Sequence, residues 1–185
     1  MAYSLFSNNI DLNDPNASHL NSCFNFDVDT FNDNIQLSNS IFFMNYNIRS
    51  FNSNFNEFSI FLSDLKTPPD VITLTETWFM GNNSDSIDGY HGYHCSRNPE
   101  TSGNGGGVSI FIRKTLKCKV YVESYDNLPE IEFLHLRLNM NESNKYHILA
   151  VYRPPNSVLL NNFLEKIETT LDKILLVNLP SWQAI

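Results

Sequence analysis

The sequence predicts an α/β fold in which mixed β-sheet structure is covered by at least two helices. A β-branched run, Val71–Thr75, follows an apolar helical repeat, as expected for a βαβ unit. Several segments after residue 90 alternate between apolar and polar residues, which is typical of strands with one buried face. A chain of 185 residues is long enough for one domain with a sizeable core.

The predicted sheet begins with this βαβ unit. Residues 41–48 are apolar and β-prone, and this first core strand is expected to end near Asn47. Residues 51–56 are interpreted as a polar crossing, and a helix is predicted from about Asn54 to Lys66. The apolar face of that helix consists of Phe55, Phe58, Phe61, Leu62 and Leu65.

Glu76 directly follows the buried run Val71–Thr75, which carries no charge of its own. The two strands of a right-handed βαβ unit are parallel and adjacent, so Asn47 and Glu76 are expected side by side at one edge of the sheet. Ligands and metals are commonly bound at such strand ends. Glu76 is therefore a candidate site residue, although a capping or loop role fits this stretch equally well.

A glycine run, residues 103–107, precedes a predicted strand. Such a run either cradles phosphate or forms a flexible hairpin turn, and the turn is favoured because no helix N-terminus follows. Residues 81–92 are expected to be a surface loop. Further strands are predicted at 90–95, 108–113, 117–124, 131–138, 146–152 and 173–177, with a helix from Ser157 to about Leu171 before the last one.

Residues 1–40 differ in composition from the rest of the chain, with nine Asn, five Asp and no Lys, Arg or Glu. We predict a mostly disordered leader. The alternative is a short docked arm that uses Phe24, Phe26 and Phe31. The net charge of the whole chain is −8, and residues 41–185 carry only −3 of it, from 15 acids against 12 bases. A phosphate-bearing partner is not excluded, although no broad basic footprint for nucleic acid is visible.

The three cysteines, Cys23, Cys95 and Cys118, show no metal-binding spacing and fit a reducing compartment. The sequence contains neither a signal-peptide pattern nor an apolar run of membrane-spanning length. We therefore expect an intracellular protein, in the nucleus or cytoplasm, that is not secreted and has no membrane partner. The sequence does not indicate an oligomeric state.

Four short motifs occur in a fixed order along the chain and together resemble the N-terminal part of an endonuclease/exonuclease/phosphatase domain. The closest resemblance is to the apurinic-type endonuclease of non-LTR (LINE-like) retrotransposons, which lies upstream of the reverse transcriptase. The resemblance implies a DNase-I-like, four-layer α/β sandwich and Mg²⁺-dependent nicking of DNA. The motifs are Asn47-Ile48-Arg49-Ser50, Leu74-Thr75-Glu76-Thr77-Trp78, Gly105-Gly106-Gly107-Val108-Ser109-Ile110 and Val151-Tyr152-Arg153-Pro154-Pro155.

The resemblance also implies roles for residues at matching positions. Glu76 and Asn47 are the candidate metal ligands, for Mg²⁺ or Mn²⁺, which are hard cations that prefer oxygen ligands. Asn47, Glu76 and Tyr152 are the candidate catalytic residues, and the Tyr152 hydroxyl would lie at the edge of the active site. Arg49 and Arg153 are candidate phosphate contacts, although solvated surface arginines are the more common case.

Two further residues lie close to these motifs in the sequence. Arg97 is a third candidate phosphate contact by position, with the same reservation about surface arginines. Trp78 either faces DNA or packs under a loop, and packing is favoured.

The chain departs from the family pattern after residue 177. The family carries a Gly-Asp-Phe-Asn-like motif there and a later Asp-His motif, whereas this chain continues Asn178-Leu179-Pro180. His135 and His147 lie inside predicted strands and do not replace the missing base. A general base contributes roughly 10²–10⁴-fold. We therefore expect a truncated, inactive domain at residues 41–178, followed by an irregular tail at 179–185.

Two other functions stay open at this point. One is a non-catalytic nucleic-acid-binding module that keeps the phosphate-facing edge without the chemistry. The other is a phosphodiesterase or phosphatase of the same superfamily that acts on lipids or nucleotides.

Overall fold

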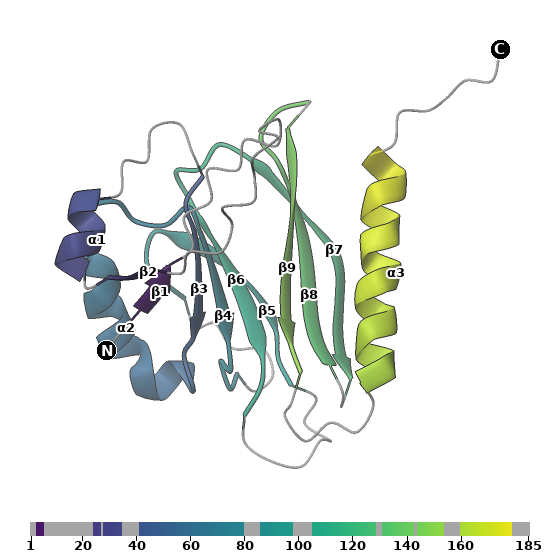
Figure 1. Ribbon diagram of the computed structural model, residues 1–185, viewed down its shortest axis with the longest axis horizontal. Helices are drawn as coiled ribbons and strands as arrows, with labels where there is room; N and C mark the ends of the chain where they lie inside the picture. The colour runs from purple at the N-terminus through teal and green to yellow at the C-terminus, as the bar shows by residue number, and fades with distance from the viewer. Residues whose placement is uncertain are drawn as a thin grey trace.

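Two β-sheets pack face to face and helices cover their outer faces (Figure 1). The computed structural model describes residues 3–5, 24–26, 28–34, 41–79, 86–97, 105–128, 131–142, 144–153 and 160–178. The first sheet contains, in spatial order, β3 (Phe43–Asn47), β4 (Val71–Thr75), β6 (Val108–Arg113) and β5 (Tyr90–Cys95). The second contains β7 (Lys119–Leu128), β8 (Ile131–Asn139) and β9 (Lys145–Tyr152).

Helices α1 (Val28–Asn34) and α2 (Phe51–Asp64) lie outside the first sheet, and α3 (Leu160–Asn178) lies outside the second (Figure 1). A separate antiparallel pair joins β1 (Tyr3–Leu5) to β2 (Phe24–Phe26). The four-layer α/β arrangement with a mixed sheet is therefore confirmed. Within the described residues, no helix is long and apolar enough to span a membrane.

The predicted βαβ unit is present. Strands β3 and β4 are parallel neighbours, and their last residues, Asn47 and Thr75, are register partners. Helix α2 begins at Phe51, three residues before the predicted start, so the predicted polar crossing is wrong. Ser50 caps the helix, since its hydroxyl accepts a hydrogen bond from the Ser53 amide at 3.3 Å. Phe51 is buried against the sheet, but the polar residues around it in the first turn favour a later helix start in the sequence-based prediction.

Two apolar cores hold the layers together. The first lies between the helices and the first sheet and includes Phe58 and Phe61 of α2 packed on Ile72 and Leu74 of β4. The second lies between the two sheets, where alternate residues of β6 meet those of β8. It contains Val108, Ile110, Ile112, Leu134, Leu136 and Leu138. Alternation of side chains along these strands explains why each strand supplies residues to opposite faces.

Strands β5, β6, β8 and β9 lie where the sequence predicts them, within one residue at each end. Strand β7 runs on to Leu128, four residues beyond the prediction, and its pairing with β8 shifts register between Val122 and Ser124. This irregularity places Glu123 at a β-bulge, a feature that re-aims side chains. Strands β5 and β6 are antiparallel neighbours, as the predicted hairpin requires.

The predicted final strand at 173–177 is wrong, because α3 continues through it to Asn178. No glycine or proline interrupts residues 160–178. The less exposed residues of α3 recur at helical spacing past Leu171, the predicted end of the helix. Leu171 itself is exposed. The less exposed face contains Phe163, Ile167, Thr170 and Ile174.

Part of the predicted leader is ordered structure. Phe31 of α1 is buried, with its ring centroid 5.7 Å from that of Phe42, as the docked-arm alternative expects. Asn32 strengthens this contact, since its side-chain amide donates to the Asp64 carbonyl at 2.7 Å and its oxygen accepts from the Lys66 amide at 2.8 Å. Residues 6–23, 35–40 and 179–185 lie outside the described residues, so disorder in the leader and irregularity in the tail stay predictions there.

Candidate functional site

Three of the predicted site residues converge at the ends of β3, β4 and β9. The Asn47 side-chain amide donates to Oε1 of Glu76 at 3.0 Å, and the Tyr152 hydroxyl donates to the same oxygen at 3.3 Å. Asn47 is exposed, whereas Glu76 and Tyr152 are half-buried. Residues separated by up to 105 positions in the sequence therefore form one polar cluster around a single carboxylate.

The backbone at this edge is unusually constrained. Among the described residues, positive φ angles at non-glycine positions occur only at Arg49 (47°), Ser50 (85°), Glu76 (54°) and Trp78 (59°). Such conformations cost of the order of 1–3 kcal/mol each and persist where the surroundings enforce them. Their clustering beside one carboxylate is typical of a functional site.

Backbone hydrogen bonds on both sides enforce this geometry. The Glu76 carbonyl accepts from the Ser50 amide at 2.8 Å. On the other side, the Thr77 amide donates to Gly107 at 3.2 Å and the Trp78 amide donates to Gly106 at 2.9 Å. The segment after β4 is therefore held between the start of α2 and the glycine run before β6, which fixes the direction of the Glu76 side chain.

The side chains around Glu76 can hold a hard divalent cation through one carboxylate, that of Glu76 itself. Within the described part of the chain, no hydrogen-bond donor reaches the second carboxylate oxygen, Oε2, which is available to a cation and its waters. Asn47 instead uses its amide nitrogen on Glu76, while its oxygen accepts from the Arg49 amide at 3.2 Å. In this arrangement Asn47 orients the carboxylate, and its role as a metal ligand stays a prediction.

No group of three or more His, Cys, Asp or Glu side chains suited to a metal ion occurs among the residues with described positions. A Mg²⁺ ion often takes only one or two protein carboxylates and completes its shell with water and phosphate oxygens. A single-carboxylate site of this kind is therefore compatible with weak Mg²⁺ binding.

Tyr152 is suited to donate a hydrogen bond rather than to carry charge. Its pKa is raised above the ordinary value by burial and then by the neighbouring Glu76 carboxylate. The hydroxyl therefore keeps its proton at neutral pH and can donate it in a hydrogen bond to an anionic oxygen.

Sequence reasoning missed Glu132, which is 1% exposed and lies next to this cluster on β8. Its carboxylate accepts from the Gly107 amide and from Nε of Arg97, the latter at 2.7 Å. Burial raises the pKa of Glu132, while the hydrogen bond from Arg97 acts in the opposite direction. Glu132 thereby fixes the glycine run that in turn fixes the backbone after Glu76.

The glycines of this run are required for close packing. Gly105, Gly106 and Gly107 all have positive φ angles, and a Cβ at Gly106 would collide with the Glu132 carboxylate. A Cβ at Gly107 would collide with Thr77. Since the Gly107 amide is used by Glu132, this amide is not free to cradle phosphate, in agreement with the favoured turn interpretation.

The candidate phosphate contacts are placed differently from one another. Arg49 is exposed directly beside Asn47, whereas Arg97 is held by Glu132. Arg153 is half-buried immediately after Tyr152. Trp78 is 40% exposed at the same edge. Residues 80–85, which follow it, lie outside the described residues, so packing under a loop stays a prediction.

These features define a class of protein: a two-sheet α/β sandwich whose polar site is centred on a glutamate at the end of a core strand. The profile of the Endonuclease/Exonuclease/phosphatase family matches residues 44–166, and the chain belongs to this family. That match includes Asn47, Glu76 and Tyr152. No curated protein sequence matches the chain significantly.

Solved structures show a related fold. The AP endonuclease LMAP from Leishmania major is 16% identical, with a TM-score of 0.50, over 71% of this chain and 46% of that one. The 3′ phosphatase NExo from Neisseria, bound to a product DNA hairpin, is 16% identical with a TM-score of 0.42, over 70% of this chain and 48% of its own. The chain thus spans about half the length of these structures, and the first of them supports a DNase-I-like fold.

Proposed function

We propose that this chain is part of a divalent-metal-dependent endonuclease domain of the retrotransposon type, which acts on DNA phosphodiester bonds. The observation that carries the proposal is the convergence of Asn47 and Tyr152 on one oxygen of Glu76. Membership of the Endonuclease/Exonuclease/phosphatase family supports the reaction class. The order of the four motifs supports the retrotransposon branch, and an intracellular location is part of the same proposal.

Each residue at this edge would have a distinct role. A bound Mg²⁺ or Mn²⁺ would neutralise charge on the phosphate and the leaving oxygen. Glu76 would hold the cation, and Asn47 would keep the carboxylate in place. Tyr152 would donate a hydrogen bond to a phosphate oxygen, and Arg49 is exposed on the side where the phosphate backbone would pass.

We further propose that these 185 residues do not hydrolyse DNA by themselves. The sequence contains no Gly-Asp-x-Asn motif, and in the described structure neither histidine of the His135–His147 pair contacts the Glu76 cluster. On this proposal, no described residue acts as the general base for water at the phosphate. Such a strand edge can still contact a phosphate backbone through a bound metal ion.

The exposure of Trp78, just after the end of β4, favours a second candidate, a non-catalytic nucleic-acid-binding module. An exposed indole at a phosphate-facing edge can stack on a base that is not paired. This candidate retains the same residues but assigns no chemistry to them.

Two assays with the purified chain test the proposal. Binding to a fluorescent duplex oligonucleotide is expected to strengthen several-fold when Mg²⁺ is added and to weaken as salt rises. Glu76→Gln should abolish the Mg²⁺-dependent part and leave the rest unchanged. Binding that does not respond to Mg²⁺ in the wild-type chain would contradict the metal role of Glu76.

Nicking of supercoiled plasmid in Mg²⁺, with EDTA and Glu76→Gln controls, separates the alternatives. We expect no nicking above the controls. Nicking by the wild type alone would show that the site is right and the predicted inactivity is wrong. Release of phosphate from a 3′-phosphorylated oligonucleotide, without nicking, would favour a phosphatase of the same superfamily.

A further inference from the structure

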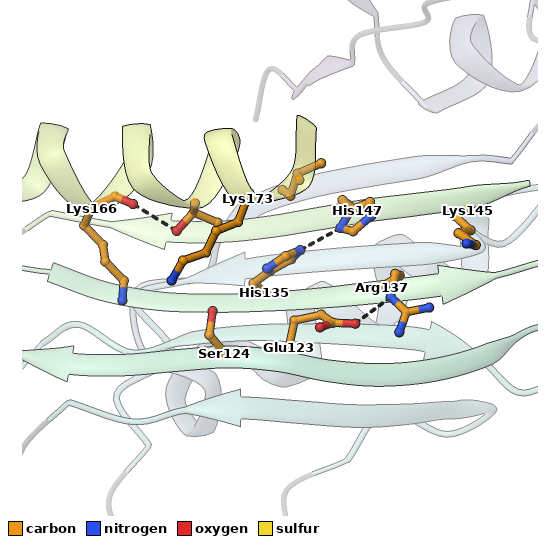
Figure 2. A pocket seen from close by; sticks show the side chains of 10 residues that line it. Glu123, Ser124, His135, Arg137, Lys145, His147, Lys166 and Lys173 are labelled. Atoms are coloured by element: carbon orange, nitrogen blue, oxygen red, sulfur yellow. Dashed lines mark hydrogen bonds and ion pairs between the residues drawn. The ribbon is translucent and has the colours of Figure 1, made fainter. Parts of the chain in front are cut away.

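A second polar region lies on the outer face of the second sheet, beneath α3. A cavity of about 370 Å³ opens there between the helix and strands β7, β8 and β9 (Figure 2). It is separate from the Glu76 cluster, because Tyr152 packs against the core between the two sheets. His135 and His147 lie on the other face of their strands and line the cavity.

The lining of this cavity is strongly basic in an acidic chain. Four of the 12 lysines and arginines line it, namely Arg137, Lys145, Lys166 and Lys173. Among the described residues of the lining there is one carboxylate, that of Glu123, which pairs with Nε of Arg137 at 2.5 Å. With neutral histidines the described residues of the lining therefore carry four positive charges against one negative charge, whereas the whole chain has a net charge of −8.

Two lysines of α3 extend into the cavity from the side of the helix. Lys166 and Lys173 are seven residues apart, about two helical turns, and both extend from the helix toward the strands (Figure 2). The Nζ atom of Lys166 lies 5.6 Å from the ring centroid of Phe133 on β8. In the structure as described, no carboxylate forms an ion pair with Lys145 or Lys173.

Hydrogen-bonding groups on the strands complete the cavity. His135 Nε2 and His147 Nδ1 are 2.9 Å apart, so one ring donates to the other (Figure 2). Nε2 of His147 is buried and has no hydrogen-bond partner among the residues that the structure describes. A buried polar atom without a partner costs free energy, and such atoms in native proteins often mark a missing ligand or water.

We propose that this cavity binds a phosphate group, either free phosphate or the phosphate monoester of a small molecule, with Lys166 and Lys173 as its main cationic contacts. Two ammonium groups from one helix and the imidazoles on the strands match the charge and the acceptor oxygens of a phosphate. The volume lies within the range of small-molecule pockets. Because α3 covers the cavity, a mononucleotide or a free phosphate fits its size better than a DNA duplex does.

Titration calorimetry of the whole chain, with inorganic phosphate and with a deoxynucleoside monophosphate as separate probes, tests the proposal. We expect at least one probe to bind, and the two probes distinguish a bare phosphate site from a nucleotide site. Lys166→Gln combined with Lys173→Gln should weaken binding by about tenfold or more, since each lysine gives a charge-assisted contact. The matched control, Lys114→Gln with Lys117→Gln, removes two exposed lysines outside the cavity and should leave binding unchanged.

Ring ¹⁵N signals of His135 and His147 in the wild-type chain give a second readout, which does not depend on the folding of any variant. We expect these signals to shift with the same saturation curve as the calorimetry. The proposal is overturned if neither probe binds, if the histidine signals do not move, or if the folded lysine variant binds as well as the wild type. Displacement of the bound phosphate by a short DNA duplex would assign the cavity to DNA instead.

Discussion

Two arginine–glutamate ion pairs, one beside the candidate site and one in the basic cavity, differ in burial and in what they hold. Arg97 and Glu132 are 2.7 Å apart, with side chains 19% and 2% exposed. Arg137 and Glu123 are 2.5 Å apart, with side chains 23% and 34% exposed. Among the described residues, only the first of these carboxylates also accepts a hydrogen bond from a backbone amide, that of Gly107.

The difference shows how similar side chains take on different roles. A buried carboxylate must have its oxygens satisfied, so Glu132 fixes a glycine run whose carbonyls hold the backbone after Glu76. A half-exposed pair is partly solvated and contributes little to stability. Glu123 therefore balances one cation of the cavity, Arg137, whereas Lys145 and Lys173 form no ion pair with a described carboxylate.

The largest effect is expected from closing the space at the glycine run. Gly106→Val places a side chain against the Glu132 carboxylate at a φ of 76°, and we expect the free energy of unfolding to fall by about 3 kcal/mol or more. Gly89→Ala is the matched control. Gly89 also has a positive φ, but no described atom lies within 4 Å of the position that an added Cβ would take, so a loss of about 1 kcal/mol is expected. Equal losses in urea unfolding would show that packing at Gly106 is unimportant.

A smaller effect is expected from Glu132→Gln, which keeps the size of the side chain but leaves Arg97 without its charge partner. We expect a loss of about 2 kcal/mol in the free energy of unfolding, because Arg97 and the Gly107 amide lose a charged acceptor. Glu123→Gln removes the corresponding charge in the cavity and should cost less than about 1 kcal/mol. If the two variants lose equal stability, the contrast between the regions is wrong.

The smallest effect concerns pH and the histidine pair of the cavity. Burial lowers the pKa of both His135 and His147 below the ordinary value, and the nearby Arg137 acts in the same direction, while Glu123 opposes it. The unfolded chain therefore binds more protons than the folded one below about pH 6.5, and stability falls as the pH decreases through this range.

The melting temperature is expected to drop by a few degrees between pH 7.5 and pH 5.5 because of this pair. His135→Gln combined with His147→Gln should remove that component, whereas His91→Gln, at an exposed position, should keep it. The same pH dependence in all three proteins would rule out the histidine pair as its source.

The sequence predicts the βαβ unit and the meeting of Asn47 and Glu76, because parallel neighbouring strands end at one edge whatever their side chains. It also contains a signal for Glu132 that the prediction did not use. Glu132 has the same parity as Leu134, Leu136 and Leu138, so its side chain points between the sheets. A carboxylate on an otherwise apolar strand face is unusual enough to indicate a buried partner.

The end of α3 could not be predicted from local sequence. Residues 173–177 form a short apolar run, which suits a buried strand or the continuation of a helix equally well. The short apolar run before Asn178-Leu179-Pro180 favoured the strand in the prediction, whereas no glycine or proline interrupts the helix through these residues. The packing of α3 over β7 and β8 also creates the basic cavity. No linear sequence motif marks this cavity, because its cations come from three separate elements.

The most direct test of the account is where a divalent cation binds. Mn²⁺ added to the ¹⁵N-labelled chain broadens the NMR signals of nuclei near it, and we expect this broadening at the side-chain amide of Asn47 and the backbone amide of Thr77. Glu76→Gln should abolish it while the rest of the spectrum stays folded. Broadening that is absent in the wild type, or unchanged in Glu76→Gln, would contradict the claim that this strand edge is a metal site.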